Sequence, residues 1–391
     1  MAIRAACLLM LSLATGGCVD SPAAQTFTLS RYPVFDLRAD LAESLMPDEE
    51  ALVRRSMDAV EEVIRQRARG KNIGRGDHAK ALGCYRAGFT VSSRDVVRAE
   101  DRVGVARPEN LGRRFEAVVR LSNSEPKDVA DLRSATTGLA VKVALDPAVH
   151  AGDDRLLGEG DQDFVAGGLQ DRFVSRSIVD YADLIELRIH SYRNVFKLWS
   201  RHPEAFRVFG TDPLLRSVSL SATAAPLVLE KRFSSLLPYA WGSAAVKFRF
   251  EPCHAFDRSA ASFNRFDAGY QAKVLADFLR SNDVCYVMKV QPRPQAGSED
   301  ERRVIASAFP IEDATVLWPE PGPQTPAPSA EFREVARVTI KSGTPPMADD
   351  ACERLAFNPW NGLKAHQPLG SLSRARLAVY KHSESVRKQL Q

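Results

Sequence analysis

The first regular pattern of apolar and polar positions follows Pro47 and predicts a helix. Three acidic residues come directly after this proline, where the start of a helix favours negative charge. Apolar residues then recur at the spacing of one helix face, at Val53, Met57, Val60 and Ile64. Arginines precede Gly70, at the end of a helix that favours cations. The segment between Pro47 and Gly70 should therefore form a helix with one buried face.

Patterns typical of strands fill the middle of the chain. Between Phe115 and Val174, glycine and aspartate separate apolar runs, and Val141 and Val143 alternate with Lys142. Similar patterns return at residues 246–250, 284–290 and 335–340. Prolines between residues 319 and 328 predict a stiff connection along the surface and not a domain boundary, because a strand pattern resumes after them.

Helical periodicity separates the strand regions, at residues 177–209 and 268–280, and returns at the C-terminus. In the first of these helices, a set of large apolar residues is interpreted as core packing and not as the lining of a binding site: Tyr181, Ile185, Ile189 and Tyr192. The order of helix, strands, helices, strands and helix predicts an α+β fold around an antiparallel barrel.

Composition agrees with one large globular domain. The chain has 391 residues, of which 45% are hydrophobic and 26% charged. We place the domain at residues 41–391, after a tether at residues 18–40. Lysine and arginine number 53 against 49 acidic residues, and no basic run alternates with aromatic residues. Nucleic acid is therefore not expected as a partner.

The N-terminus has the features of an export signal. Arg4 precedes a short apolar run, and small residues lead to Cys18. The run is too short to span a bilayer. Cleavage before Cys18 would remove residues 1–17 and expose a thiol that can be acylated, which predicts a periplasmic protein held to a bacterial membrane by a lipid anchor. Thr15 stands where leucine is usual, so conventional cleavage near Ala24 stays open.

Four of the six cysteines lie beyond this signal, namely Cys84, Cys253, Cys285 and Cys352. No pair has the spacing of metal ligands, so zinc is not expected. In an oxidising compartment the four could form up to two disulfides, with three possible connectivities. Each could equally be a buried apolar thiol.

The C-terminal helix carries the most informative side chains. Arg376, Tyr380 and Arg387 fall within one narrow stripe at about 100° per residue, so that two guanidiniums flank one phenol. A neighbouring guanidinium favours the ionised phenol, and a phenolate is one of the few protein ligands of ferric haem. The alternative is an ordinary amphipathic helix with a half-buried tyrosine and a solvated basic face.

A second segment, Arg75-Gly-Asp-His78-Ala-Lys-Ala-Leu-Gly83, carries an imidazole that can move protons between peroxide oxygens. Together the two segments resemble the catalase superfamily, whose members carry Arg-x-x-His-Ala-Lys-Gly at the distal histidine and Arg-x-x-x-Tyr at the proximal ligand. Further matches follow in the same order, at Arg120-Leu-Ser122, Gly138-Leu-Ala-Val-Lys142-Val143, Asp163-Phe-Val-Ala-Gly-Gly168 and Phe357-Asn-Pro359. The likeness is strongest to the shorter catalase-like haem proteins.

The resemblance implies haem b, buried between an antiparallel barrel and the C-terminal helix. Tyr380 would be the axial ligand of the iron, Arg376 would keep its phenol ionised, and His78 would be the distal acid and base. Ser122 falls on the position that hydrogen-bonds the distal histidine. Three arginines fall on positions that pair with haem propionates, namely Arg75, Arg120 and Arg387.

Departures from the family pattern bear on activity. Gly167 stands where catalases have an asparagine that steadies the peroxide, and loss of such a donor costs about 10²-fold in rate. Asp77 replaces an apolar residue, so its carboxylate would favour protonated His78 unless it turned to solvent or paired with Arg75. Ala81 replaces the signature glycine, and His382-Ser383 replaces an Asp-Thr pair.

From these features we expect a haem-dependent peroxidase or other hydroperoxide-processing enzyme with weak catalase activity. Its substrate would be hydrogen peroxide or an organic or lipid hydroperoxide, and relatives such as allene oxide synthase make a hydroperoxide isomerase conceivable. The alternatives are an exported haem-binding lipoprotein with little turnover and a remnant that no longer binds haem. An oligomer is possible. The remaining histidines are expected at the surface or as capping residues, namely His150, His190, His202, His254 and His366.

Overall fold

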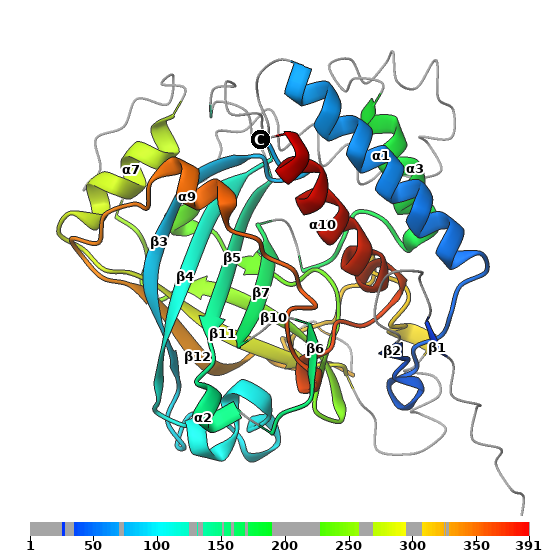
Figure 1. The fold of residues 1–391 in the computed structure, drawn as a ribbon. Helices are drawn as coiled ribbons and strands as arrows, with labels where there is room; N and C mark the ends of the chain where they lie inside the picture. Colours follow the sequence, from blue (N-terminus) through cyan, green and yellow to red (C-terminus); the bar gives the residue numbers. More distant parts are fainter. Residues whose placement is uncertain are drawn as a thin grey trace, which may run out of the picture.

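A β-barrel forms the centre of the protein (Figure 1). The computed structural model describes residues 26–27, 35–69, 74–124, 131, 136–150, 152–157, 160–168, 171–189, 227–257, 269–294, 307–323, 325 and 328–390. The predicted signal at residues 1–17 and the predicted lipidation site Cys18 lie outside these residues, as does part of the predicted tether at residues 18–40.

The barrel consists of antiparallel strands paired in the order β11-β12-β3-β4-β5-β7-β8-β10, and β10 pairs back with β11 to close the ring. Its strands are β3 (Lys80–Val91), β4 (Arg114–Asn123), β5 (Thr137–Ala144), β7 (Asp161–Gly167), β8 (Phe233–Ser234), β10 (Ala244–Pro252), β11 (Val284–Pro292) and β12 (Arg333–Ile340). Short strands accompany them, namely β1 (Thr26–Phe27), β2 (Phe35–Asp36), β6 (Arg155–Leu157), β9 (Tyr239–Trp241) and β13 (Gly362–Leu363).

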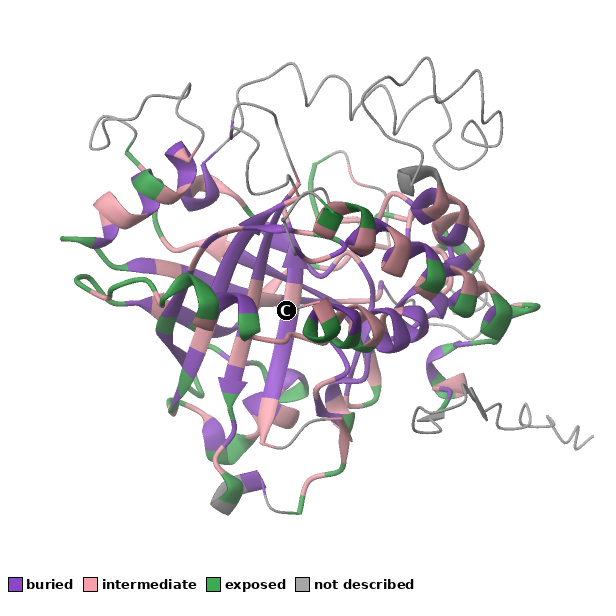
Figure 2. Ribbon diagram, turned by 45° about the horizontal axis from the view of Figure 1, so that its top comes forward, coloured by how far each residue is buried: buried purple, intermediate pink, exposed green. Residues whose placement is uncertain are grey.

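Aromatic and branched side chains fill the inside of the barrel. The ring of Phe164 lies 5.9 Å from that of Phe89 and 5.5 Å from that of Phe248, measured between centroids. All three residues are buried, and Figure 2 shows the strands as mostly buried along their length. The barrel interior is therefore a packed core, as expected for a barrel of this size, and space for a ligand must lie outside its wall.

Helices cover the barrel in two places. The helices are α1 (Glu49–Arg69), α2 (Pro147–His150), α3 (Ile178–Ile189), α7 (Tyr270–Leu279), α9 (Asp349–Arg354) and α10 (Ser371–Leu390). In Figure 1, α1, α3 and α10 form a layer on one side, whereas α7 and α9 lie near β3. The buried faces of α1, α3 and α10 meet through Val60, Ile64, Ile185, Val379 and Val386.

Ion pairs fix α10 against α1 and against the segment that precedes α1. The guanidinium of Arg374 is buried and binds Glu49 on α1 at 2.6 Å and Glu43 at 2.8 Å. Two residues after Tyr380, the imidazole of His382 lies 2.7 Å from the Glu61 carboxylate, also on α1. His382 thus joins two helices.

Most predicted elements appear close to their expected places, with one clear omission. The sequence pattern did not indicate β3, because Gly83 and Gly88 interrupt its apolar run and a bulge between Ala81 and Gly83 shifts the alternation. Ala81 itself lies in this strand opposite Ser122, where an alanine fits without strain. The helix expected over residues 177–209 is present as α3, and residues 190–209 lie outside the described part.

The four cysteines form two disulfides, Cys84–Cys352 and Cys253–Cys285. The first joins β3 to α9, and the second joins the end of β10 to β11. Over the described residues, no helix has both the length and the apolar run needed to cross a membrane.

Two of the histidines expected at the surface or as capping residues are buried. His150 is 5% exposed and contacts Asp153, whereas His366 is 1% exposed and accepts a hydrogen bond from the Val105 N–H at 3.0 Å. Burial and then the charge of His150 lower the pKa of His366 to about 3. His254 is exposed as expected, and His190 and His202 lie outside the described residues.

Candidate functional site

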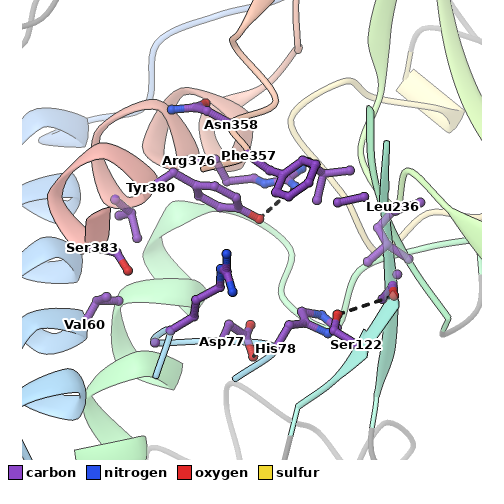
Figure 3. Close-up of a pocket in the computed structure, with 18 of the residues that line it drawn as sticks. Val60, Asp77, His78, Ser122, Leu236, Phe357, Asn358, Arg376, Tyr380 and Ser383 are labelled. Carbon is purple, nitrogen blue, oxygen red and sulfur yellow. Dashed lines mark hydrogen bonds between the residues drawn. The ribbon is translucent and has the colours of Figure 1, made fainter. Parts of the chain in front are cut away.

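A cavity lies between the barrel wall and the layer formed by α1, α3 and α10. Residues expected to form the site all line it, namely Arg75, His78, Arg120, Ser122, Arg376, Tyr380 and Arg387. Figure 3 shows Arg376 and Tyr380 on the helical side, with His78 and Ser122 across the cavity on the barrel side. Tertiary structure thus brings the two signature segments to opposite walls of one space.

Tyr380 is held by the arginine one turn before it. The Arg376 guanidinium donates a hydrogen bond to the phenol oxygen at 3.1 Å, and its central carbon lies 5.2 Å from the centroid of the tyrosine ring. Burial would lower the pKa of Arg376, but attraction to the phenols of Tyr380 and Tyr239 raises it above the ordinary value. A permanent cation therefore stands beside the phenol oxygen.

His78 has an unusual backbone conformation. Its φ is 48°, in the left-handed region that histidine visits more often than most residues but at some cost. The side chain of Asp77 is bonded at 3.2 Å to the His78 main-chain N–H, and Asp77 is exposed. Arg75 is paired with Glu353 at 2.9 Å. Asp77 also lines the cavity, and its carboxylate accepts the His78 N–H and so helps to fix the backbone of that histidine.

Gly138 allows the imidazole to approach the barrel wall. A Cβ atom on this glycine would lie 2.8 Å from Nδ1 of His78 and 3.0 Å from Oγ of Ser122. Ser122 donates a hydrogen bond to the Gly138 carbonyl oxygen at 3.4 Å, and its bond to the imidazole remains a prediction. Any side chain at position 138 would displace the histidine.

Leu236 occupies the space next to Gly167. A Cβ atom on Gly167 would lie 2.9 Å from Cδ1 of Leu236, and both residues line the cavity. Leu236 has a φ of 63°, a conformation that costs a leucine about 1 kcal/mol or more. An apolar side chain in a strained position thus lies against Gly167 in the cavity wall.

Three arginines at the cavity form a compact positive cluster. Arg120 is 4% exposed and donates a hydrogen bond to the His78 carbonyl oxygen at 3.0 Å. Burial, followed by repulsion from Arg75, lowers the pKa of Arg120 to about 9. Burial and repulsion from Arg387 lower the pKa of Arg75 to about 10. Among the described residues, the Nε atoms of Arg120 and Arg387 are buried without a hydrogen-bond partner.

Two carboxylates compensate this cluster in part. Glu353 is 8% exposed, and its attraction raises the pKa of all three arginines against the effect of burial. Glu384, which lines the cavity, also attracts Arg387. The three guanidiniums exceed these two carboxylates by one positive charge, which suits a ligand that carries carboxylates.

A buried aspartate fixes the turn between α9 and β13. Asp163 on β7 accepts a hydrogen bond from Lys142 at 2.7 Å and another from the Asn358 N–H at 2.9 Å. Burial raises the pKa of Asp163 to about 6, although attraction to Lys142 opposes the shift. The Lys142 ammonium also lies 5.5 Å from the centroid of the Phe357 ring, which lines the cavity. Lys142 therefore contacts both Asp163 and Phe357, so that three segments matched in the sequence lie together in the structure.

Several residues at the site were not anticipated from the sequence. Leu236 lines the cavity, and Glu353 pairs with the lining residue Arg75, but neither belongs to a matched motif. Tyr181 and Ile185 on α3 line the cavity as well as packing between helices, so their interpretation as core residues alone was wrong. Ile189 and Tyr192 could not be placed, because the side chains from residue 187 to 226 lie outside the described part.

Comparison with solved structures identifies the fold as that of catalases. The chain is similar to a fungal catalase (17% identity, TM-score 0.56), to catalase A from Saccharomyces cerevisiae (18%, 0.57) and to a bacterial catalase (16%, 0.56), in each case over 83% of its length. It spans 61%, 63% and 59% of those chains, respectively. No family model and no curated protein matches the sequence. The catalase-type α+β fold expected from the sequence is thereby confirmed.

Proposed function

We propose that this protein binds haem b in the cavity and processes hydroperoxides there. The observation that carries the proposal is the placement of Tyr380 and His78 on opposite walls of one cavity edged by three arginines. Tyr380 would hold the iron, since a phenolate stabilised by Arg376 is a suitable axial ligand. Two carboxylates of a haem would pair with Arg75, Arg120 and Arg387.

The donor set fits this ligand. The unpartnered Nε atoms of Arg120 and Arg387 are buried, and a buried donor without a partner is costly unless a ligand satisfies it. Apolar residues from the helices and the barrel form much of the remaining wall, including Val60, Ile185, Val165 and Leu372. A flat apolar ligand with two acidic groups matches both parts of the lining.

Bound haem would supply an iron centre at which the O–O bond of a peroxide can break. His78 would take the proton from the oxygen that approaches the iron and return it to the leaving oxygen. Gly138 allows the imidazole to stand close to the wall, and the hydrogen bond from Arg120 to the His78 carbonyl holds its backbone.

The distal wall favours organic hydroperoxides over hydrogen peroxide. Neither Gly167 nor Leu236 can donate a side-chain hydrogen bond, so a bound peroxide is not steadied as it would be by an amide. An alkyl group can instead contact Leu236 and Leu237, which both line the cavity. Weak catalase activity and a stronger reaction with cumene or lipid hydroperoxide are the expected pattern. The same features favour, as a second candidate, a haem-binding protein with little turnover.

The test is a spectrum of the haem-reconstituted protein, followed by assays with hydrogen peroxide, cumene hydroperoxide and a lipid hydroperoxide. The parent should show a Soret band with high-spin ferric tyrosinate features. Tyr380→Phe should lose haem, and His78→Ala should keep haem but lose at least about 10²-fold of any peroxide reaction. A parent that stays colourless refutes the proposal, and full turnover by His78→Ala refutes the distal role. Spectral features without turnover would favour the second candidate.

We also propose that the protein is exported and anchored by a lipid on Cys18. Two disulfides support an oxidising compartment, because such bonds are rare in the cytosol of mesophiles.

A further inference from the structure

The arginine cluster takes its geometry from one short segment of the chain. Arg75 donates one hydrogen bond to the Glu353 carboxylate at 2.9 Å and another to the Leu355 carbonyl oxygen at 2.6 Å. Arg387 donates to the Glu353 carbonyl oxygen at 3.1 Å. Two of the three guanidiniums are therefore oriented by acceptors on α9 and the residue directly after it.

This segment needs an anchor from outside itself. The helix α9 has 6 residues, too few for its own hydrogen bonds to keep it folded. The two guanidiniums that it orients also repel one another, because the charge of Arg387, after burial, lowers the pKa of Arg75. A loosened α9 would move Glu353 away and let the arginines separate.

The Cys84–Cys352 disulfide is placed to prevent this movement. Cys352 directly precedes Glu353, and Cys84 lies on β3 opposite Arg120 of β4. The Met347 N–H also donates to the Cys84 carbonyl oxygen at 2.8 Å, so the chain entering α9 is held at the same point of the barrel. Both half-cystines are buried, with 0% and 3% exposure. In Figure 1, α9 accordingly lies against β3.

We propose that the Cys84–Cys352 disulfide positions the anion-binding arginines by pinning Glu353 and Leu355 to the barrel wall. The bond acts through these acceptors and does not itself contact the ligand. Where the ligand is haem, the inference rests on the proposed function. Its consequence is that the disulfide controls how long the acidic groups of the cofactor stay bound.

The second disulfide provides a matched control. Cys253 and Cys285 join neighbouring strands β10 and β11, whose register is already fixed by backbone pairing. The Cys253 N–H donates to the Cys285 carbonyl oxygen at 3.0 Å, and neither residue lines the cavity. Its removal takes away a crosslink without touching the segment that orients the arginines.

The experiment compares the parent with Cys84→Ala/Cys352→Ala and Cys253→Ala/Cys285→Ala. The three proteins are reconstituted with haem, and transfer of haem to excess apomyoglobin is followed. We expect the first variant to release haem about tenfold faster or more, since it weakens charge-assisted hydrogen bonds, and the control variant to stay within about twofold of the parent. Equal release rates for the two variants would overturn the inference. Should the first variant not fold, Cys352→Ala replaces it in the comparison. This single substitution also removes the disulfide but leaves the sequence of β3 unchanged.

Hydrogen exchange of the haem-free proteins separates this inference from the proposed function. Amides of residues 349–355 should exchange faster in Cys84→Ala/Cys352→Ala than in the parent and the control variant. Unchanged protection of this segment would overturn the inference whether or not haem binds. A parent that takes up no haem, but shows the expected exchange, would overturn the proposed function and leave the positioning of the arginines supported.

Discussion

Replacing Gly167 by asparagine tests how the distal wall is built. Gly167 ends β7, and its φ does not lie in the left-handed region, so the backbone accepts a side chain. The obstacle is Leu236, whose Cδ1 would lie 2.9 Å from the new Cβ. Because this atom is the end of a flexible side chain, we expect Gly167→Asn to lower the free energy of unfolding by about 1 to 2 kcal/mol.

Adding Leu236→Gly should recover most of this loss. Glycine removes the obstructing side chain and also accepts the φ of 63° without the strain that leucine bears there. Lost burial of the half-buried leucine offsets part of the gain. In a double-mutant cycle, the coupling between the two substitutions should therefore be about 1 kcal/mol or more and favourable.

Urea denaturation of the haem-free proteins, followed by tryptophan fluorescence, measures these free energies. Gly152→Asn is the control, because nothing lies within 4 Å of a Cβ at Gly152, and it should change stability by less than about 0.5 kcal/mol. Additive effects of Gly167→Asn and Leu236→Gly would refute the packing argument. After haem reconstitution, the double variant should decompose hydrogen peroxide about 10²-fold faster than the parent, since an amide donor is restored.

Two further predictions concern pH dependence and export. The pKa of His366 is about 3 when folded and 6.5 as its ordinary value, so its stabilising contribution is complete above pH 6.5 and is lost as the pH falls towards 3. His366→Gln keeps an acceptor for the Val105 N–H. In urea titrations, this variant should therefore lose about 3 kcal/mol less stability than the parent between pH 7 and pH 4. The control His254→Gln, at an exposed site, should lose as much as the parent. For export, Cys18→Ala should move the protein from the membrane fraction to the soluble periplasmic fraction. An unchanged distribution would exclude lipidation at this residue.

The sequence by itself identified residues that the structure brings to one cavity. The spacing of Arg376, Tyr380 and Arg387 on one helix face is a local property, and the residues around His78 form a contiguous motif. The main helices and most strands were also readable, because periodicity reports which face of a segment is buried. The strand β3 escaped because glycines and a bulge break its alternation.

Only the tertiary structure decided which distant residues support that site. Arg75 and Glu353 lie 278 positions apart, and no local pattern marks the glutamate as the counter-ion of three arginines. The pairing of four cysteines, the approach of Leu236 to Gly167 and the burial of His366 likewise follow from the closure of the barrel and the docking of its helices. Periodicity specifies which face of each element is buried, whereas the partner on that face depends on how all the elements pack together.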